Sequence, residues 1–249
     1  MKSEVRIFKD VESLSEAAAG LFAEKARGAL QACGRFLAAL NGGNTPLPLF
    51  HLLASRYRDE LDWSRIHLFW GDERCVPPDD PGSNFGQARQ ALLKQLPIPE
   101  ANLHRIRGEL GPQEAAKDYA LLLRRFAEPP LDWPRFHLVL LCLGEDGHTA
   151  SLFPGSPIEA SEPVQAVTAH YQDRPAERVS LTPPVLNGAR LVLFMVSGQA
   201  KAEVLRRVLG DTRDPLSLPA QRIEPKDGKV LWLVDESAAA GLPKQAARN

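Results

Sequence analysis

The chain contains few cysteines, and their spacing argues against a disulfide framework. Among its 249 residues there are three, Cys33, Cys75 and Cys142, which lie far apart and form no CxxC pair. An odd, sparse set of this kind is typical of reduced thiols in a cytosol and not of a disulfide-stapled secreted domain. We therefore expect a cytoplasmic protein in which the cysteines are mostly structural.

Long hydrophobic runs are absent too. The longest, such as residues 138–143 and 191–196, fall far short of the roughly 20 apolar residues that a helix needs to cross a bilayer. At the beginning of the chain, the stretch MKSEVRIFKD carries charges that interrupt any apolar signal core. The sequence therefore predicts neither a membrane span nor a secretion signal.

No run of one charge sign stands out. The 30 Lys and Arg residues are balanced by 31 Asp and Glu residues, which gives a net charge of −1. Without a basic arm in the sequence, we expect no nucleic-acid partner. A small anionic ligand is compatible with this balance, because a few local cations are enough to bind a phosphate. The oligomeric state stays open, and nothing in the sequence argues against a monomer.

Several motifs of cofactor, metal and nucleophile chemistry are also missing. The sequence has no GxGxxG fingerprint, no GxxxxGK phosphate loop and no GxSxG elbow. It has no HxxxH pair and no Cys/His cluster, so we expect no bound metal. Ser151 lies one helical turn from His148, but without the elbow a Ser–His hydrolase is not favoured.

What the sequence does contain is an alternation of apolar strands and amphipathic helices. Its 44% of hydrophobic residues are enough for a substantial core. The strands are continuously apolar, which is typical of a parallel sheet covered by helices on both faces. Strands are expected at residues 5–8, 36–40, 66–70, 103–106, 136–143, 164–169, 179–181, 190–196 and 230–234. Helices are expected at residues 10–33, 84–95, 112–126 and 201–209, with a capping box from Ser13 to Glu16 in the first.

The simplest architecture for this pattern is one α/β domain over residues 1–242, doubly wound around a mainly parallel sheet, with room for a small subdomain. Residues 243–249 are predicted to form a polar C-terminal tail. In doubly wound sheets, ligands bind beyond the carboxyl ends of the strands, where the strand order reverses. Four of the segments that follow strands here are polar or rich in glycine, and they are the candidates for a site.

The first segment, Gly42-Gly43-Asn44-Thr45-Pro46, follows a predicted strand and opens a helix. Two glycines let the backbone approach a ligand closely, and the helix offers unpaired N–H groups to an anion. The Thr45 hydroxyl can add a hydrogen bond. An ordinary strand-to-helix turn is the alternative explanation for these glycines.

The second segment, Gly71-Asp72-Glu73-Arg74, follows the buried strand at residues 66–70. Two carboxylates beside an arginine can orient one another and hold a hydroxylated, anionic ligand. A solvated charged loop is the alternative, since loops are commonly charged.

The third segment, residues 144–151, contains Asp146 and His148 and follows the most apolar strand. An imidazole titrates near neutral pH, which suits it to take a proton from water and return it to a leaving oxygen. Asp146, two positions earlier, is placed to influence the charge or orientation of the site. A surface or capping histidine is the alternative. The remaining histidines lack such a setting: His51, His67, His104, His137 and His170.

The fourth group is a pair of cations, Arg178 just before the strand at residues 179–181 and Lys201 after the strand at residues 190–196. Either is suited to clamp a phosphate, Arg with its bidentate fork and Lys as a point charge. A surface charge is the alternative for each.

Taken together, these segments resemble the 6-phosphogluconolactonase family. Five stretches carry the resemblance in the same order along the chain: LNGGNTP at 40–46, FWGDERCVPPDDPGSNFGQAR at 69–89, LGEDGHTASLFPGSP at 143–157, ERVSLTPPVLNGA at 177–189 and VSGQAKAEVL at 196–205. One short motif arises easily by chance, whereas five in sequence are specific. The chain departs from the usual pattern at Asn41 and Asn44, where serines are common, but asparagine can also form hydrogen bonds.

The resemblance implies hydrolysis of 6-phospho-D-glucono-1,5-lactone to 6-phosphogluconate in the pentose phosphate pathway, without a metal or organic cofactor. It also implies the fold of the glucosamine-6-phosphate deaminase and ribose-5-phosphate isomerase superfamily. His148 is the implied general base and Asp146 its acidic neighbour. With Asp72 from the charged segment added, the expected substrate- and phosphate-binding set is Gly42, Gly43, Asn44, Thr45, Asp72, Arg74, Arg178 and Lys201.

Two alternatives share this scaffold. Glucosamine-6-phosphate deaminases tend to follow the Asp-Gly-His motif with an Asn-Glu-Pro segment whose glutamate assists catalysis, and residues 149–154 contain no glutamate here. A non-catalytic sugar-phosphate sensor is the other alternative. An intact Asp146-Gly147-His148 beside Arg74 argues against it, since a sensor has no need of a base.

Overall fold

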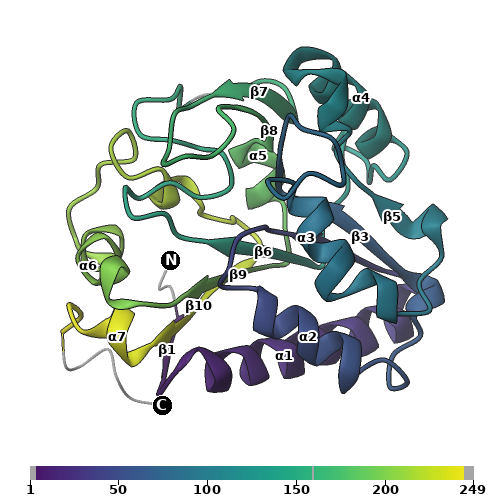
Figure 1. The fold of residues 1–249 in the computed structure, drawn as a ribbon, viewed down its shortest axis with the longest axis horizontal. Helices are drawn as coiled ribbons and strands as arrows, with labels where there is room; N and C mark the ends of the chain where they lie inside the picture. The colour runs from purple at the N-terminus through teal and green to yellow at the C-terminus, as the bar shows by residue number, and fades with distance from the viewer. Residues whose placement is uncertain (1–3, 159, 244–249) are drawn as a thin grey trace.

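The computed structural model describes residues 4–158 and 160–243, and two sheets organise them (Figure 1). The strands of the main sheet are β1 (Glu4–Phe8), β2 (Phe36–Leu40), β3 (Ile66–Trp70), β5 (Leu103–His104), β6 (Leu138–Cys142), β9 (Leu191–Val196) and β10 (Lys229–Asp235). They are all parallel, in the order β1-β10-β9-β6-β2-β3-β5. The smaller sheet is antiparallel and consists of β4 (Asp72–Arg74), β8 (Glu177–Leu181) and β7 (Val164–Thr168), in that order. Most of the predicted C-terminal tail, from residue 244 onward, lies outside the described residues.

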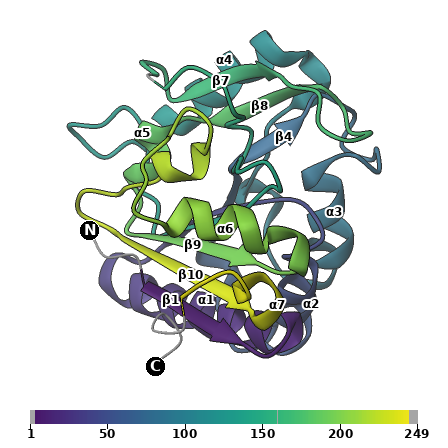
Figure 2. The same ribbon diagram turned by 90° about the vertical axis from the view of Figure 1, so that its left-hand side faces the viewer.

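Helices cover both faces of the main sheet, which confirms the predicted fold class. Their bounds are α1 (Val11–Cys33), α2 (Leu47–Ser55), α3 (Asn84–Ala91), α4 (Pro112–Arg124), α5 (Pro183–Asn187), α6 (Ala202–Leu209) and α7 (Glu236–Ala239). In Figure 2, α1 and α2 lie below the sheet, and α6 lies above β9 and β10. Helix α4 packs against β7 and β8, so the small sheet and α4 form a layer of their own on the upper side. No helix in the described part of the chain is long and apolar enough to cross a membrane.

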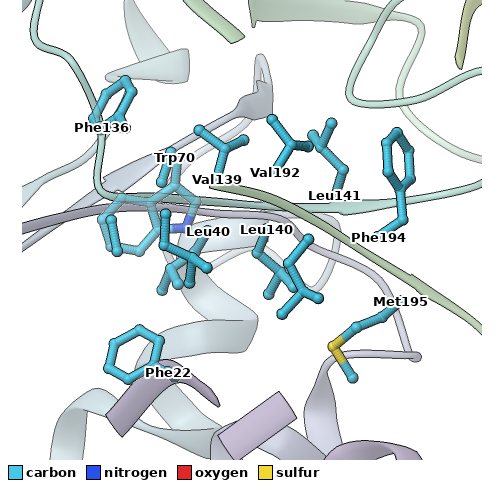
Figure 3. Close-up of a cluster of buried hydrophobic side chains, with 14 of the residues drawn as sticks. Phe22, Leu40, Trp70, Phe136, Val139, Leu140, Leu141, Val192, Phe194 and Met195 are labelled. Carbon is cyan, nitrogen blue, oxygen red and sulfur yellow. The ribbon is translucent and has the colours of Figure 1, made fainter. Parts of the chain in front are cut away.

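The continuous apolar runs follow from burial of the main sheet on both sides. Every residue of β2 and every residue of β9 is buried. Successive side chains of a strand point to opposite faces, and Figure 3 shows this alternation along β6 and β9. The side chains directed to one face are Val139, Leu141, Val192 and Phe194, and those directed toward Phe22 of α1 are Leu140 and Met195. Because both faces meet helices or the small sheet, neither tolerates the polar positions of a half-exposed strand.

The predicted capping box of α1 is wrong by one turn. The N-cap is Asp10, whose carboxylate accepts a hydrogen bond from the Ser13 N–H at 2.9 Å, while the Asp10 N–H donates to Ser13 Oγ at 3.3 Å. Ser13 is therefore the third residue of the box and not its first. Asp10 has the extended backbone expected at an N-cap, because β1 ends only two residues earlier.

The other differences from expectation include a missed strand and several element bounds: β5 and β6 are shorter than expected, and α5 and α7 were not predicted. Asp72–Arg74 was expected to be a loop, but it forms β4 because it pairs with β8, where Arg74 lies opposite Arg178. Local sequence carries no sign of a partner strand about a hundred residues away. The helix expected at residues 84–95 ends at Ala91, and a 3₁₀ turn, Leu93–Gln95, continues it.

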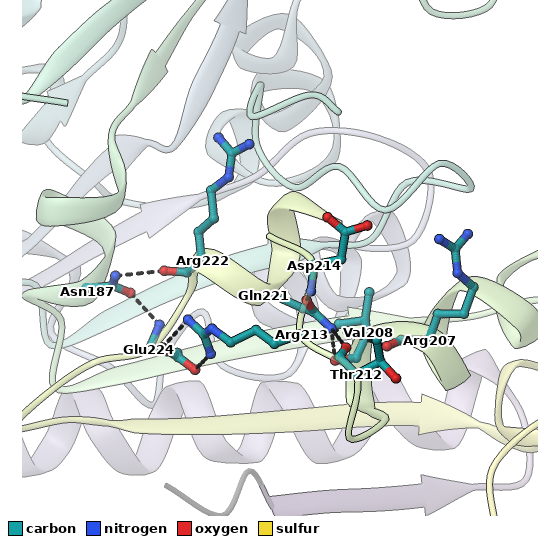
Figure 4. Close-up of polar contacts among 9 residues, drawn as sticks. All are labelled: Asn187, Arg207, Val208, Thr212, Arg213, Asp214, Gln221, Arg222 and Glu224. Atoms are coloured by element: carbon teal, nitrogen blue, oxygen red, sulfur yellow. Dashed lines mark hydrogen bonds and ion pairs between the residues drawn. The ribbon is translucent and has the colours of Figure 1, made fainter. Parts of the chain in front are cut away.

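The irregular segment between α6 and β10 is held by side-chain amides (Figure 4). The Gln221 amide donates to three carbonyl oxygens at and just beyond the end of α6, those of Arg207, Val208 and Thr212. Asn187 likewise binds the main chain of the segment through both atoms of its amide. The Ala220 N–H then donates to the Gly147 carbonyl oxygen at 3.0 Å. This segment therefore supports the loop that follows β6.

Candidate active site

Four loops that follow neighbouring strands meet at one edge of the main sheet. They follow β9, β6, β2 and β3, which are adjacent in the sheet. After β2 the chain runs through α2 to β3 on one side, and after β6 it returns to β9 on the other. The order therefore reverses between β2 and β6, at the point where open α/β sheets bind ligands. A pocket of about 240 Å³ opens there.

The structure brings the predicted site residues together. The pocket is lined by Gly42, Gly43, Asn44, Thr45, Asp72, Arg74, His148, Arg178 and Lys201. Asp146 does not line the pocket, but its carboxylate contacts Nδ1 of His148. Cys75, which follows Arg74 in sequence, does not line the pocket either, and burial raises the pKa of its thiol to about 11. A thiol with so high a pKa carries almost no thiolate at neutral pH.

The glycine-rich loop after β2 needs its glycines for two different reasons. A Cβ on Gly42 would lie 1.8 Å from Oδ1 of Asn84, so only glycine lets α3 approach this loop. Gly43 has a φ of 97°, in the region that side chains rarely adopt. The loop then enters α2 at Leu47, which confirms that a helix follows this segment.

His148 and Asp146 form a hydrogen-bonded pair. Nδ1 of His148 lies 2.5 Å from Oδ1 of Asp146, and the His148 backbone N–H donates to the same oxygen at 3.1 Å. Burial by itself raises the pKa of the Asp146 carboxyl, but the hydrogen bonds and charge of His148 outweigh it and lower the pKa. An ionised carboxylate only accepts, so Nδ1 donates to it, and in the neutral form of the ring the lone pair is on Nε2. A Cβ on Gly144 would lie 2.1 Å from Nδ1, which explains the glycine before this pair.

Asp72 holds loops together at the floor of the pocket. Its carboxylate accepts hydrogen bonds from Ser151 Oγ at 2.7 Å and from the Asn84 amide at 3.1 Å. The neighbouring Glu73 points away from the pocket into the base of α3, where it accepts from the backbone N–H groups of Asn84 and Phe85. Residues 72–74 are therefore buried and connect neighbouring loops, so the alternative of a solvated charged loop is wrong.

The three predicted cations differ in how well they are paired. Arg178 is 2% exposed, and its Nε and Nη2 have no hydrogen-bond acceptor among residues 4–158 and 160–243. Arg74 Nη1 donates to the Gly82 carbonyl oxygen at 2.6 Å, but its Nε also has no acceptor there. Lys201 lies 3.6 Å from Glu145. Burial lowers the pKa of Arg178 and of Lys201, and Glu145 opposes that effect at Lys201.

Sequence reasoning missed several residues of the pocket. Asn84 lies within the second matching stretch, but its amide has no distinctive spacing. Tyr171, Gln172 and Arg174 come from the connection between β7 and β8, which carries no motif. Only the pairing of those two strands brings the connection over the pocket, and that pairing is not visible in local sequence. Within the described residues, no group of three His, Cys, Asp or Glu side chains is placed to hold a metal ion.

Comparison with known proteins agrees with the geometry. Residues 9–232 match the family model described as glucosamine-6-phosphate isomerases/6-phosphogluconolactonase. A 6-phosphogluconolactonase from Synechocystis is 41% identical over 84% of this chain and 85% of its own length. One from Nostoc is 36% identical over 97% of this chain and 99% of its own.

A solved structure gives the same result at the level of the fold. The 6-phosphogluconolactonase of Trypanosoma brucei superimposes with a TM-score of 0.86 at 28% sequence identity, covering 97% of this chain and 99% of that one. The family match spans all four loops of the pocket, and the relatives match over most of their own length. The chain belongs to the glucosamine-6-phosphate isomerase/6-phosphogluconolactonase family.

Proposed function

We propose that this protein hydrolyses 6-phospho-D-glucono-1,5-lactone to 6-phosphogluconate, with water as the nucleophile and His148 as the general base. The observation that carries the proposal is the hydrogen bond between His148 and Asp146 at a pocket that four cationic side chains line. The pair supports a base with a fixed tautomer, and the cations support an anionic substrate. The names of the relatives support the choice of this lactone within the family.

The phosphate is assigned to the arginines of the small sheet. Arg74 and Arg178 lie opposite each other in the β4–β8 pair, where two like charges destabilise the sheet. Both are buried and both have nitrogen atoms without an acceptor among the described residues. A phosphate dianion offsets this repulsion and accepts charge-assisted hydrogen bonds. Arg174 and Lys201 add positive charge around the same pocket.

In the proposed reaction His148 first accepts a proton and then donates it. Nε2 of His148 takes a proton from water, and the water oxygen forms a bond to the lactone carbonyl carbon. The tetrahedral oxyanion then collapses, the bond between that carbon and the ring oxygen breaks, and the ring oxygen takes the proton from Nε2. The product acid ionises and releases a proton to solvent. General-base assistance of this kind typically contributes about 10²–10⁴-fold.

Asp146 stabilises the imidazolium that exists between the two proton transfers. Its carboxylate binds Nδ1–H and stays ionised while His148 carries the extra proton. The segment that follows His148, residues 149–154, contains no carboxylate, and its residue that lines the pocket is Ala150. A deaminase-type glutamate is therefore missing from this position, which supports the lactonase over the deaminase.

The test compares the purified protein with His148→Ala and with a matched control, His51→Gln, whose histidine is exposed on α2 away from the pocket. The lactone is generated in situ by oxidation of glucose 6-phosphate, and acid release is followed against the spontaneous rate. We expect acceleration by the wild type and by His51→Gln, and loss of most turnover in His148→Ala with product binding retained.

Two further outcomes distinguish the alternatives. Ammonia release from glucosamine 6-phosphate would identify a deaminase. Binding of sugar phosphates without turnover of either substrate would identify a sensor. Unchanged turnover of the lactone in His148→Ala would show that His148 is not the general base, while the proposed substrate would still hold.

We also propose that the reaction takes place in the cytoplasm. Cys33, Cys75 and Cys142 are all free thiols, as expected of a protein that works in a reducing compartment.

A further inference from the structure

His148 is surrounded by two aromatic rings as well as by its carboxylate partner. A single hydrogen bond at Nδ1 leaves an imidazole free to swing about that contact. The ring of Phe153 is stacked on it, with centroids 4.4 Å apart and an interplanar angle of 29°. The ring of Tyr171 meets it edge to face, at 4.6 Å and 77°. These two rings, which we name the aromatic clamp, restrict the swing that the hydrogen bond permits.

Phe153 connects the base to the small sheet. The guanidinium carbon of Arg178 lies 5.2 Å from the centroid of the Phe153 ring, within the range of a cation–π contact. Phe153 is 7% exposed and lies in the same loop as His148. The Phe153 ring is therefore buried and contacts Arg178 of β8 on one side, while it is stacked on the His148 ring.

Tyr171 reaches the base from a different part of the chain. It lies in the connection between β7 and β8 and is partly exposed. Its hydroxyl oxygen accepts a hydrogen bond from the Glu145 N–H at 3.4 Å. The ring and the hydroxyl of Tyr171 therefore both contact residues 145–148, and the ring contact is direct whereas the hydroxyl acts through the backbone.

We propose that Tyr171 is a positioning residue for the base: its ring closes the aromatic clamp and keeps the imidazole oriented so that Nε2 faces the pocket. This rests on the proposed function of His148 as the base. Tyr171 takes no part in proton transfer, and its ring matters more than its hydroxyl. A base that is misplaced by about 1 Å can lose about 10²-fold in rate.

The test uses Tyr171→Leu, Tyr171→Phe and a matched control, Tyr57→Leu, since Tyr57 is also partly buried but lies outside the pocket. We expect Tyr171→Leu to lower kcat by about 10- to 100-fold with KM changed by less than about threefold, because orientation is lost and binding is kept. Tyr171→Phe keeps the ring and is expected to retain kcat within about twofold, and Tyr57→Leu to retain wild-type kinetics.

A second measurement follows the imidazole itself and does not depend on turnover. The Nδ1-bound proton of His148 gives a separate low-field NMR signal while its hydrogen bond to Asp146 is stable. In Tyr171→Leu we expect this signal to broaden through faster exchange, and in Tyr171→Phe to stay sharp. An inactive wild type would overturn the proposed function alone, since the NMR comparison still tests the clamp.

Three results would overturn the positioning role. Wild-type kcat in Tyr171→Leu, with a sharp Nδ1 proton signal, would show that the ring does not hold the base. A raised KM at constant kcat would make Tyr171 a substrate-binding residue instead. A loss in Tyr171→Phe equal to that in Tyr171→Leu would assign the effect to the hydroxyl.

Discussion

The charge of Asp146 can be separated from its geometry by substitution with asparagine. Both hydrogen bonds from His148, at 2.5 Å from Nδ1 and at 3.1 Å from the backbone N–H, end on the same oxygen, Oδ1. An amide oxygen in that position accepts both. Asp146→Asn therefore removes the negative charge and retains the hydrogen bonds, whereas Asp146→Ala removes both.

The size of each effect follows from the two kinds of hydrogen bond. A hydrogen bond to a charged group contributes about 1.5–3 kcal/mol, and one between neutral groups about 0.5–1.5 kcal/mol. The charge at Asp146 is present at neutral pH, because the hydrogen bonds and charge of His148 lower the pKa of its carboxyl despite burial. Its loss removes about 1.4 kcal/mol from the stabilised imidazolium, which corresponds to about a tenfold lower kcat. Asp146→Ala also loses orientation and is expected to fall by about 100-fold.

The assay is acid release from the lactone between pH 5.5 and 8.5, with kcat and kcat/KM measured at each pH. Without the carboxylate the imidazolium loses its charged partner, so we expect kcat and kcat/KM of Asp146→Asn to fall by about tenfold at neutral pH. Equal losses in the Asn and Ala variants would refute the separation of charge from geometry. Wild-type kcat in Asp146→Asn would show that the charge of Asp146 does not assist His148.

Three further predictions concern the base, the fold at acid pH and the core. Gly144→Ala places a Cβ 2.1 Å from Nδ1 of His148 and is expected to lower kcat by about 10²-fold with KM retained, as steady-state kinetics would show. Burial, and then the charge of His67, lowers the pKa of His104 from 6.5 to about 4. The unfolded chain therefore binds more protons between these values, and His104 contributes about 2 kcal/mol to the stability lost between pH 7 and pH 5. Urea unfolding of His104→Gln at these two pH values should therefore show a loss about 2 kcal/mol smaller than that of the wild type. Phe22→Ala empties a site that is 1% exposed beside Phe36 and Trp63, and is expected to lower the unfolding free energy by about 3–5 kcal/mol.

Local sequence predicts the main sheet well because burial on both faces leaves a strong local pattern. Strand β2 and strand β9 are apolar at every position, and their predicted and observed bounds differ by at most one residue. The predicted site residues cluster in one pocket for a related reason. In a parallel sheet the carboxyl ends of all strands share one edge, so polar loops after adjacent strands must meet there.

The small sheet could be predicted only in part, because β7 and β8 were expected as strands but β4 and the pairing between these strands were not. Its strand β4 is three residues long and fully charged, and it exists only because it pairs with β8. The same pairing places Arg74 opposite Arg178 and carries the β7–β8 connection, with Tyr171, over the pocket. The residues that sequence reasoning missed are therefore those whose position depends on contacts between distant segments.

Asp72 shows why residue type alone does not settle a role. A carboxylate after a buried strand is as suitable for holding a sugar hydroxyl as for joining two loops. Both of its oxygens accept hydrogen bonds from the protein, one from Asn84 and one from Ser151. Its hydrogen bond with Ser151 makes Asp72 a structural support for the loop that carries His148.

The loop that carries His148 is held by four hydrogen bonds, and the partners are spread from Asp72 to Ala220. Ser151 binds Asp72, Thr149 Oγ1 donates to the carbonyl oxygen at the end of β6, the Gly147 carbonyl accepts from the segment after α6, and the Glu145 N–H donates to Tyr171. These hydrogen bonds fix the loop and take no part in the proposed reaction. Two of the partners, Tyr171 and Ala220, lie outside the matching stretches. Substitutions that break their contacts should change kcat more than KM, because they move His148 while leaving the arginines of the small sheet in place.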